Sequence, residues 1–247
     1  MRKKVMCYLM VSIFCLYGLG ILSSCSVIPL YEREYFIYTV IDKSKKVGIL
    51  GLTDKGKEQE YLVIPETIDG NKVTYIRYSK KSIKEITKKY GDEKYAGIQS
   101  NSLKKIFVIP EIRVFDGEFF QLETSQAAVF YISKDINIHD NINHYKYYTI
   151  ENRAGSLKNH KANVLYYYNY EDSPNEGYYW IDNYEYGDTI EYIPAHPIRE
   201  GYRFGGWYKE SECINAWDFE VDTLPEVQYD EEQKEIYQET KLYAKWI

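Results

Sequence analysis

The chain lacks an excess of basic residues. Its 247 residues include 31 lysines and arginines against 37 aspartates and glutamates, which gives a formal net charge of −6. Nucleic-acid-binding proteins usually present a basic patch, so the balance argues against a nucleic-acid partner. Residues 26–160 carry 21 basic and 18 acidic residues (+3), whereas residues 161–247 carry 7 basic and 19 acidic residues (−12). That asymmetry predicts two modules of different character.

Motifs of catalysis and cofactor binding are also missing. The sequence contains no Gly-x-Ser-x-Gly, no cysteine–histidine pairing context and no phosphate-cradling glycine loop. A metal site needs closely spaced ligands, and the nearest approach to one is His139-Asp140 with His144 in a polar segment. We therefore predict no metal, no cofactor and no enzymatic activity. Because carboxylates are plentiful, an exported hydrolase with an unrecognised active site remains the alternative.

The first 26 residues have the order of a secretory signal. Residues 2–4 are basic, residues 5–22 form an apolar run without a charge, and small residues then precede Cys25. A basic segment, an apolar segment and small residues before the cut are typical of a signal peptide. The sequence Leu-Ser-Ser-Cys at residues 22–25 resembles a bacterial lipobox, in which the cysteine is lipid-modified and becomes the new N-terminus.

The lipobox resemblance implies removal of residues 1–24 and a membrane contact through acyl chains on Cys25. Two or more acyl chains hold a protein stably on a membrane, whereas one binds marginally. The expected location is the cell membrane or outer membrane, with the folded part exposed outside the cytoplasm. Two alternatives stay open. One is an uncleaved transmembrane helix, because the apolar run is near the lower limit for spanning a bilayer, and the other is an ordinary signal cleaved near Ser24.

Cysteine is scarce once the leader is removed. Cys7 and Cys15 leave with the leader and Cys25 is the anchor, so Cys213 is the one thiol left. No intramolecular disulfide is then available, and stability must come from a packed core. Tyrosine is abundant, with 28 residues against 9 phenylalanines. Tyrosine suits both strands and recognition surfaces, although a compositional bias of the genome would give the same count.

A recurring phrase predicts the organisation of the N-terminal module. Apolar runs end at Pro65, Pro110 and Ser133, with spacings of 45 and 23 residues. The first spacing is therefore about twice the second, as expected if it spans two repeat units. Self-similarity at a fixed period is typical of a solenoid. In a solenoid, short strands from successive units stack their apolar side chains into one continuous core.

The repeated unit, Leu-x-x-Ile-x-Ile-Pro followed by a Val/Ile-x-x-Ile/Phe step, resembles the BspA-type leucine-rich repeat of bacterial surface proteins. The resemblance implies a short leucine-rich-repeat solenoid, β with irregular or helical connections, over residues 35–140, after a tether at residues 25–34. A hairpin is predicted at residues 35–52. The lysine-rich residues 79–101 are either a divergent repeat or an insertion, as a helix or a loop. Residues 141–161 are predicted to be a linker.

The second module, residues 162–247, carries aromatic and glycine residues in a fixed order. The patterns Pro-x-x-Pro-x-Arg-x-Gly-Tyr-x-Phe-x-Gly-Trp-Tyr, Trp-Asp-Phe and Leu-Tyr-Ala-Lys-Trp closely resemble the Listeria–Bacteroides repeat, also called the internalin B-repeat type. The resemblance implies a small, mostly β, β-grasp-like domain. The acidic segment at residues 226–239 is longer than the corresponding segment of the family usually is. We predict that it forms a surface loop or a short helix. The residues expected to have structural roles are Gly201, Phe204, Gly206, Trp207, Trp217 and Trp246.

These features together predict a mostly β, non-enzymatic, lipid-anchored surface protein that binds an extracellular protein or glycan. Extracellular solenoids offer an extended face whose side chains can vary while the core is kept, and tyrosine-rich hot spots would supply the contact. The candidate binding surface consists of Tyr61, Tyr75, Arg77, Tyr78, Lys104 and Phe107. Besides the hydrolase, a passive envelope spacer is an alternative. If the protein is an enzyme, we expect a deep pocket, and if it is a binding module, we expect an exposed aromatic face. If it is a spacer, we expect neither feature.

Overall fold

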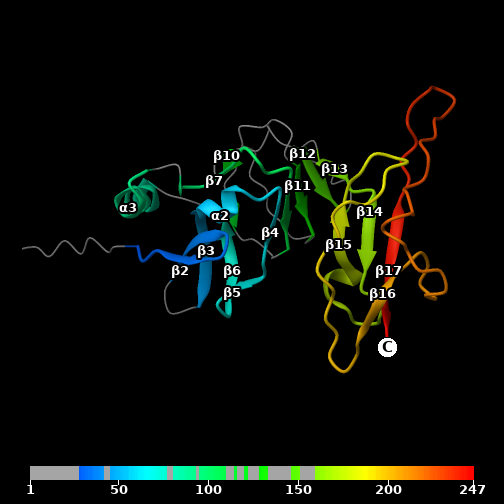
Figure 1. The fold of residues 1–247 in the computed structure, drawn as a ribbon, viewed down its shortest axis with the longest axis horizontal. Helices are drawn as coiled ribbons and strands as arrows, with labels where there is room; N and C mark the ends of the chain where they lie inside the picture. The colour runs from blue at the N-terminus through cyan, green and yellow to red at the C-terminus, as the bar shows by residue number, and fades with distance from the viewer. Residues whose placement is uncertain are drawn as a thin grey trace, which may run out of the picture.

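The computed structural model describes residues 28–41, 45–76, 80–92, 95–109, 114–115, 120–121, 128–132, 146–150 and 159–247. The predicted site residues Cys25, Arg77 and Tyr78 and the polar set His139, Asp140 and His144 lie outside these residues. The described part is mostly β (Figure 1), which confirms the predicted fold class at that level. Among the described residues, no helix combines the length and the apolar character needed to cross a membrane.

The N-terminal half contains the following elements: β1 (Tyr31–Arg33), β2 (Phe36–Ile41), β3 (Lys46–Leu52), α2 (Asp54–Lys57), β4 (Tyr61–Ile64), β5 (Thr67–Ile68), β6 (Asn71–Ile76), α3 (Lys80–Tyr90), β7 (Ile98–Gln99), β8 (Lys105–Val108), β9 (Val114–Phe115), β10 (Phe120–Gln121), β11 (Ala128–Tyr131), β12 (Lys146–Thr149) and β13 (Asn159–Lys161). The C-terminal half contains β14 (Val164–Tyr167), the 3-10 turn η4 (Pro174–Gly177), β15 (Tyr178–Asp182), β16 (Phe204–Tyr208) and β17 (Thr240–Trp246).

The N-terminal sheet has the strand order β1-β2-β3-β6-β5, and β9 also pairs with β6. Because β1 pairs with β2, the prediction of a tether at residues 25–34 is wrong for residues 31–33. Strands β2 and β3 are antiparallel neighbours, which confirms the predicted hairpin. Helix α2 begins after Thr53, whose side-chain oxygen accepts a hydrogen bond from the backbone N–H of Gly56 at 3.1 Å, as a capping residue does. Gly56 itself has no room for a Cβ, which would lie 2.3 Å from the carbonyl oxygen of Tyr35.

A second, parallel sheet has the order β13-β12-β11-β8-β4. Its strands pair in register, so that Leu62, Ile106, Val129 and Tyr147 lie side by side. These four side chains are buried against the N-terminal sheet in one hydrophobic core. Alternate residues of a strand point to opposite faces of the sheet. These four side chains therefore lie on the face of the parallel sheet that packs against the N-terminal sheet.

The opposite face of the parallel sheet carries a row of stacked rings. Phe107, Phe130, Tyr148 and His160 are register neighbours, and we call them the aromatic row. Successive ring centroids lie 5.0, 4.9 and 5.5 Å apart, a spacing at which offset aromatic pairs attract. The C-terminal module covers the Phe107 end of this row, since the ring of Trp180 lies 4.4 Å from that of Phe107. Both faces of the parallel sheet are therefore buried in its central strands.

The C-terminal sheet has the order β15-β14-β17-β16, in which β14 and β17 are parallel and the other pairs antiparallel. Trp207 is buried, and Phe204, Trp217 and Trp246 pack around the same core. The two glycines of the predicted structural set, Gly201 and Gly206, have φ of 79° and 112°, a region that favours glycine because it has no Cβ. The four aromatic motif residues thus lie in or beside the core of this module, whereas Gly201 is exposed.

The strands of the first two repeats, which are 45 residues apart in the sequence, are adjacent in the parallel sheet. Strands β4 and β8 pair directly, so the intervening segment adds no strand between them. That segment instead supplies β5 and β6 to the N-terminal sheet and then forms the helix α3. Of the two interpretations of residues 79–101, the structure therefore favours an insertion, and the described part of it is mainly helical.

The prediction of a linker at residues 141–161 is wrong for its described part. Residues 146–149 and 159–161 are strands β12 and β13 of the parallel sheet. The reason is that both strands are short and carry polar residues among their apolar ones, so that Lys-Tyr-Tyr-Thr and Asn-His-Lys resemble a loop. Strand β13 is the edge of the sheet, and edge strands retain polar residues. Only Ala162 and Asn163 separate β13 from β14, and the two modules share one hydrophobic core.

Candidate functional site

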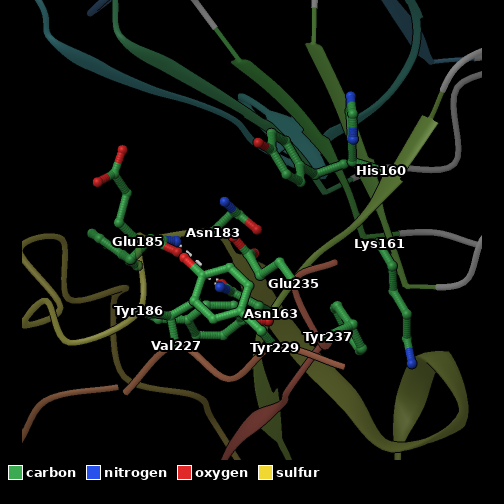
Figure 2. Close-up of a pocket in the computed structure, with 12 residues that line it drawn as sticks. His160, Lys161, Asn163, Asn183, Glu185, Tyr186, Val227, Tyr229, Glu235 and Tyr237 are labelled. Atoms are coloured by element: carbon green, nitrogen blue, oxygen red, sulfur yellow. Dashed lines mark hydrogen bonds between the residues drawn. The ribbon is translucent and has the colours of Figure 1, made fainter. Parts of the chain in front are cut away.

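A cleft of about 780 Å³ opens where the parallel sheet meets the C-terminal sheet. Figure 2 shows Glu185 on one side of it and Lys161 with Tyr237 on the other, with Asn163 and Asn183 between them. The residues that line the cleft are Tyr148, His160, Lys161, Asn163, Asn183, Tyr184, Glu185, Tyr186, Val227, Tyr229, Glu235 and Tyr237. Both modules contribute, because the first three belong to β12 and β13.

Asn163 fixes the inner wall of the cleft. Its side-chain nitrogen donates to the backbone oxygen of Tyr184 at 2.7 Å, and its side-chain oxygen accepts from the backbone N–H of Tyr184 at 3.1 Å. This reciprocal pair joins the turn between β13 and β14 to the segment that follows β15. It therefore holds Asn183, Tyr184, Glu185 and Tyr186 at the rim of the cleft.

The acidic residues 226–239 form the outer wall. They are a loop folded back on itself, because the backbone N–H of Asp230 donates to Lys234 at 2.9 Å and that of Ile236 donates to Gln228 at 2.8 Å. Tyr186 holds the loop, since its hydroxyl accepts a hydrogen bond from the backbone N–H of Gln238 at 2.7 Å. Of the two predicted forms, a loop and a short helix, the structure shows the loop.

A charged group joins the outer wall to the parallel sheet. Lys161 donates to the carboxylate of Glu239, and its ammonium lies 4.7 Å from the ring centroid of Tyr237. Burial raises the pKa of Glu239, but hydrogen bonds from Lys161 and Lys241 outweigh it, so the pKa is lowered. The hydroxyl of Tyr237 donates to the backbone oxygen of Ala162 at 2.5 Å. The wall is thus fixed before any ligand binds.

A buried ion pair lies behind the cleft. The ammonium of Lys105 on β8 donates to the Asp182 carboxylate at 2.6 Å and to the backbone oxygen of Asn183 at 3.1 Å. It also lies 3.6 Å from the ring centroid of Tyr184. The two side chains are 15% and 0% exposed. Burial raises the pKa of Asp182 and lowers that of Lys105, against their mutual attraction. The pair connects the two modules and does not face solvent.

A family model and two relatives match parts of this chain. Residues 166–245 match the family model of the Listeria-Bacteroides repeat domain. Two proteins of Evansella cellulosilytica, both named as membrane proteins and one of them as Gly-rich, are 40% and 37% identical to this chain over 62 residues. The aligned segment is 25% of this chain but only 7% and 6% of the two relatives. The predicted C-terminal repeat is therefore confirmed, and the relatives share one segment of much longer proteins.

The Listeria-Bacteroides repeat forms most of the cleft, from Asn183 through Tyr237. The cysteine of the repeat, Cys213, does not line the cleft. Burial raises the pKa of its thiol, which opposes a role as a nucleophile. Among the described residues, no group of three or more histidine, cysteine, aspartate or glutamate side chains is arranged to hold a metal ion. Tyrosine faces, two asparagine amides and two carboxylates suit a ligand that has flat apolar faces and many hydroxyl groups.

The predicted binding surface does not form one continuous face in the described structure. Tyr61 stacks on Tyr192 of the repeat at 5.0 Å and donates to Glu191 at 3.2 Å. Lys104 is exposed and pairs with Glu60 at 2.9 Å, whereas Tyr75 lies on β6 of the N-terminal sheet. Tyr61 therefore contributes to the junction between modules, and Tyr75 belongs to a different sheet.

The assignment of Phe107 to a binding surface is wrong. Its side chain is 0% exposed, because it belongs to the aromatic row that the repeat covers. A ring enclosed by Phe130, Trp180 and Tyr192 at 4.4–5.1 Å cannot meet a ligand in the folded protein. Its role in this structure is packing between the two modules.

None of the cleft residues was among the predicted site residues. The available signal is the segment Asn-Tyr-Glu-Tyr at residues 183–186, which is polar and aromatic and directly follows strand β15. Polar residues on loops held by a rigid scaffold are more often functional than polar residues within helices and strands. The contribution of β12 and β13 has no comparable signal, because their short, partly polar sequences predict a linker.

Proposed function

We propose that this protein is a non-catalytic binding protein, lipid-anchored through Cys25 on the outer side of a bacterial membrane, and that the cleft binds a glycan. The leader and the Leu-Ser-Ser-Cys sequence support the anchor. The two Evansella relatives are named as membrane proteins, and their names support a membrane location. We also propose that the in-register parallel strands are a short leucine-rich-repeat solenoid and that the repeat has a β-grasp-like fold.

The observation that carries the proposal is the composition and shape of the cleft. Its volume of about 780 Å³ falls in the range of roughly 300–1,000 Å³ typical of small-ligand sites. A protein partner would instead need a surface of about 800 Å² on each side. Sugar rings offer apolar faces to tyrosine rings and hydroxyl groups to carboxylates and amides, and Tyr229, Glu185 and Asn183 provide both kinds of partner. We therefore favour a glycan over a protein as the ligand.

Replacing Tyr229 with alanine is expected to weaken glycan binding by about 10-fold or more, a loss of roughly 1.4 kcal/mol. The protein used is residues 25–247 with Cys25→Ser, which retains every described residue, and the measurement is a glycan array followed by calorimetric titration of the best oligosaccharide. Tyr202→Ala is the matched control, because Tyr202 is 52% exposed, Tyr229 is 56% exposed, and Tyr202 does not line the cleft. Tyr202→Ala should bind like the parent.

Three outcomes would overturn this assignment. An array on which the parent binds no glycan, or equal affinity in Tyr229→Ala and the parent, would remove the cleft as a glycan site. Cleavage of the bound oligosaccharide would make the protein a hydrolase, with Glu185 and Glu235 as the first carboxylates to replace.

The anchor has its own test. Cells that make the full chain are fed radiolabelled palmitate, and the wild type is expected to incorporate label that Cys25→Ser loses completely. Cys213→Ser is the control, because Cys213 lies in the repeat and should not affect labelling. Equal labelling of the wild type and Cys25→Ser would contradict lipidation at Cys25.

A further inference from the structure

Helix α3 carries a stripe of lysines on the side away from the protein. Its 11 residues include five lysines and one glutamate, a net charge of +4. Lys80, Lys84 and Lys88 are four residues apart and exposed, so they share one face of the helix. Lys81 is adjacent to that face, and we call these four residues the lysine stripe.

The opposite side of α3 fixes the helix to the fold. Ser82 and Ile86 are buried, and Ile83 and Tyr90 pack against a small cluster with Leu50 and Ala96. At 100° per residue, the centre of this buried face is on the far side of the helix from the lysine stripe. The stripe therefore faces outward as a consequence of packing.

The chain that leads to Cys25 runs beside this helix. Ile28 and Leu30 pack in the same cluster as the buried face of α3. Tyr90 donates to the Glu32 carboxylate at 2.5 Å, and Lys89 donates to the backbone oxygen of Leu30 at 3.4 Å. Three residue steps separate Cys25 from Ile28, and they span at most about 11 Å. An anchor at Cys25 would therefore place α3 close to the membrane surface.

We propose that the lysine stripe binds the anionic headgroups of the bilayer in which Cys25 is anchored. This proposal takes the site of the anchor from the proposed function. Each lysine near an anionic surface strengthens binding by about fivefold, and a basic patch is one of the second signals that make lipid anchoring durable. The stripe is thus positioned to act together with the acyl chains.

The charge of the rest of the molecule favours the same orientation. Residues 161–247 carry 7 basic and 19 acidic residues, and Figure 1 shows β17 at the end of the long axis opposite to α3. An anionic bilayer attracts the lysine stripe and repels the C-terminal module. The expected orientation holds the cleft away from the membrane, where an extracellular ligand can reach it.

The test uses residues 25–247 with Cys25→Ser, so that acylation plays no part. Sedimentation with vesicles of phosphatidylglycerol and phosphatidylcholine is compared with sedimentation with phosphatidylcholine alone. The triple variant Lys80→Gln, Lys84→Gln and Lys88→Gln is expected to bind the anionic vesicles roughly 100-fold more weakly than the parent. The matched control removes three positive charges from the repeat, as Lys209→Gln, Lys234→Gln and Lys241→Gln, and should bind at least as well as the parent.

Raising the salt from roughly 0.1 M to 1 M shortens the screening length from about 10 Å to 3 Å and should abolish binding. Equal binding by the two triple variants, or equal binding to both kinds of vesicle, would overturn the proposal. Tighter binding to soluble polyphosphate than to anionic vesicles would also overturn it, in favour of an anionic polymer. Because the protein lacks Cys25, a failure here leaves the anchor untouched, and a failure of the palmitate labelling leaves this result untouched.

Discussion

Replacing Lys105 with methionine is expected to lower the free energy of unfolding by about 3–5 kcal/mol. The methionine fills much of the space of the lysine stem, but it leaves the Asp182 carboxylate, which is 0% exposed, without its ammonium partner. An unpaired buried charge costs far more than the net worth of the pair. Urea unfolding followed by fluorescence measures the change, with an unchanged slope showing that the unfolded state is the same.

The pH dependence identifies the cause of that loss. Burial raises the pKa of Asp182 above its ordinary 3.8, and removing Lys105 raises it further. A carboxyl group with a raised folded pKa favours the folded state when protonated, and that advantage is lost as the pH rises through the folded value. The difference between Lys105→Met and the wild type should therefore shrink as the pH is lowered toward 3.8.

Lys104→Met is the matched control for this experiment. Lys104 is the adjacent residue, and its ion pair with Glu60 is exposed on both sides. Exposed pairs contribute little to stability, so this variant should unfold like the wild type. A loss in Lys105→Met no larger than in Lys104→Met would show that the buried pair does not connect the modules as the structure indicates.

Local patterns in the sequence identified several of the strands. The hairpin at residues 35–52 and the strands at Leu62, Ile106 and Val129 follow from apolar periodicity and turn residues, and the repeat follows from its glycines and aromatics. Strands β12 and β13 escaped prediction because both are short and partly polar, and β13, as the edge strand, tolerates polar residues. Their place in the sheet is set by the pairing of β12 with β11 and of β13 with β12, which no local stretch of the sequence reveals.

The docking of the two modules could not be predicted for a related reason. Lys105 and Asp182 are 77 residues apart, and each alone has the appearance of a solvated surface charge. A signal for burial is present in residues 106–108 of β8 and in β11, whose sequences Ile-Phe-Val and Ala-Val-Phe-Tyr are apolar on both alternating faces. Such continuous runs are typical of strands covered on both sides. The cleft exists only because of this docking, so its residues had no collective signal.

Replacing Phe107 with alanine is expected to destabilise the protein by about 3–5 kcal/mol, the usual cost of truncating a buried phenylalanine. The ring fills the space between Phe130, Trp180 and Tyr192, and its loss leaves a cavity in the core that both modules share. Thermal unfolding measured by circular dichroism and by calorimetry gives the magnitude. Phe107→Leu is the matched control, because it keeps an apolar side chain and should lose only part of that stability.

The same variant distinguishes packing from recognition. A surface residue at position 107 would lose ligand affinity while the protein unfolded as before, whereas the enclosed ring predicts lower stability in every solution without ligand. Because one core spans both modules, the wild type should unfold in a single transition in which their signals coincide. In Phe107→Ala, tryptophan fluorescence, which reports the repeat that contains all four tryptophans, should separate from the far-ultraviolet signal of the whole chain. Coincident transitions at the wild-type temperature would refute the shared core and return Phe107 to the candidate surface.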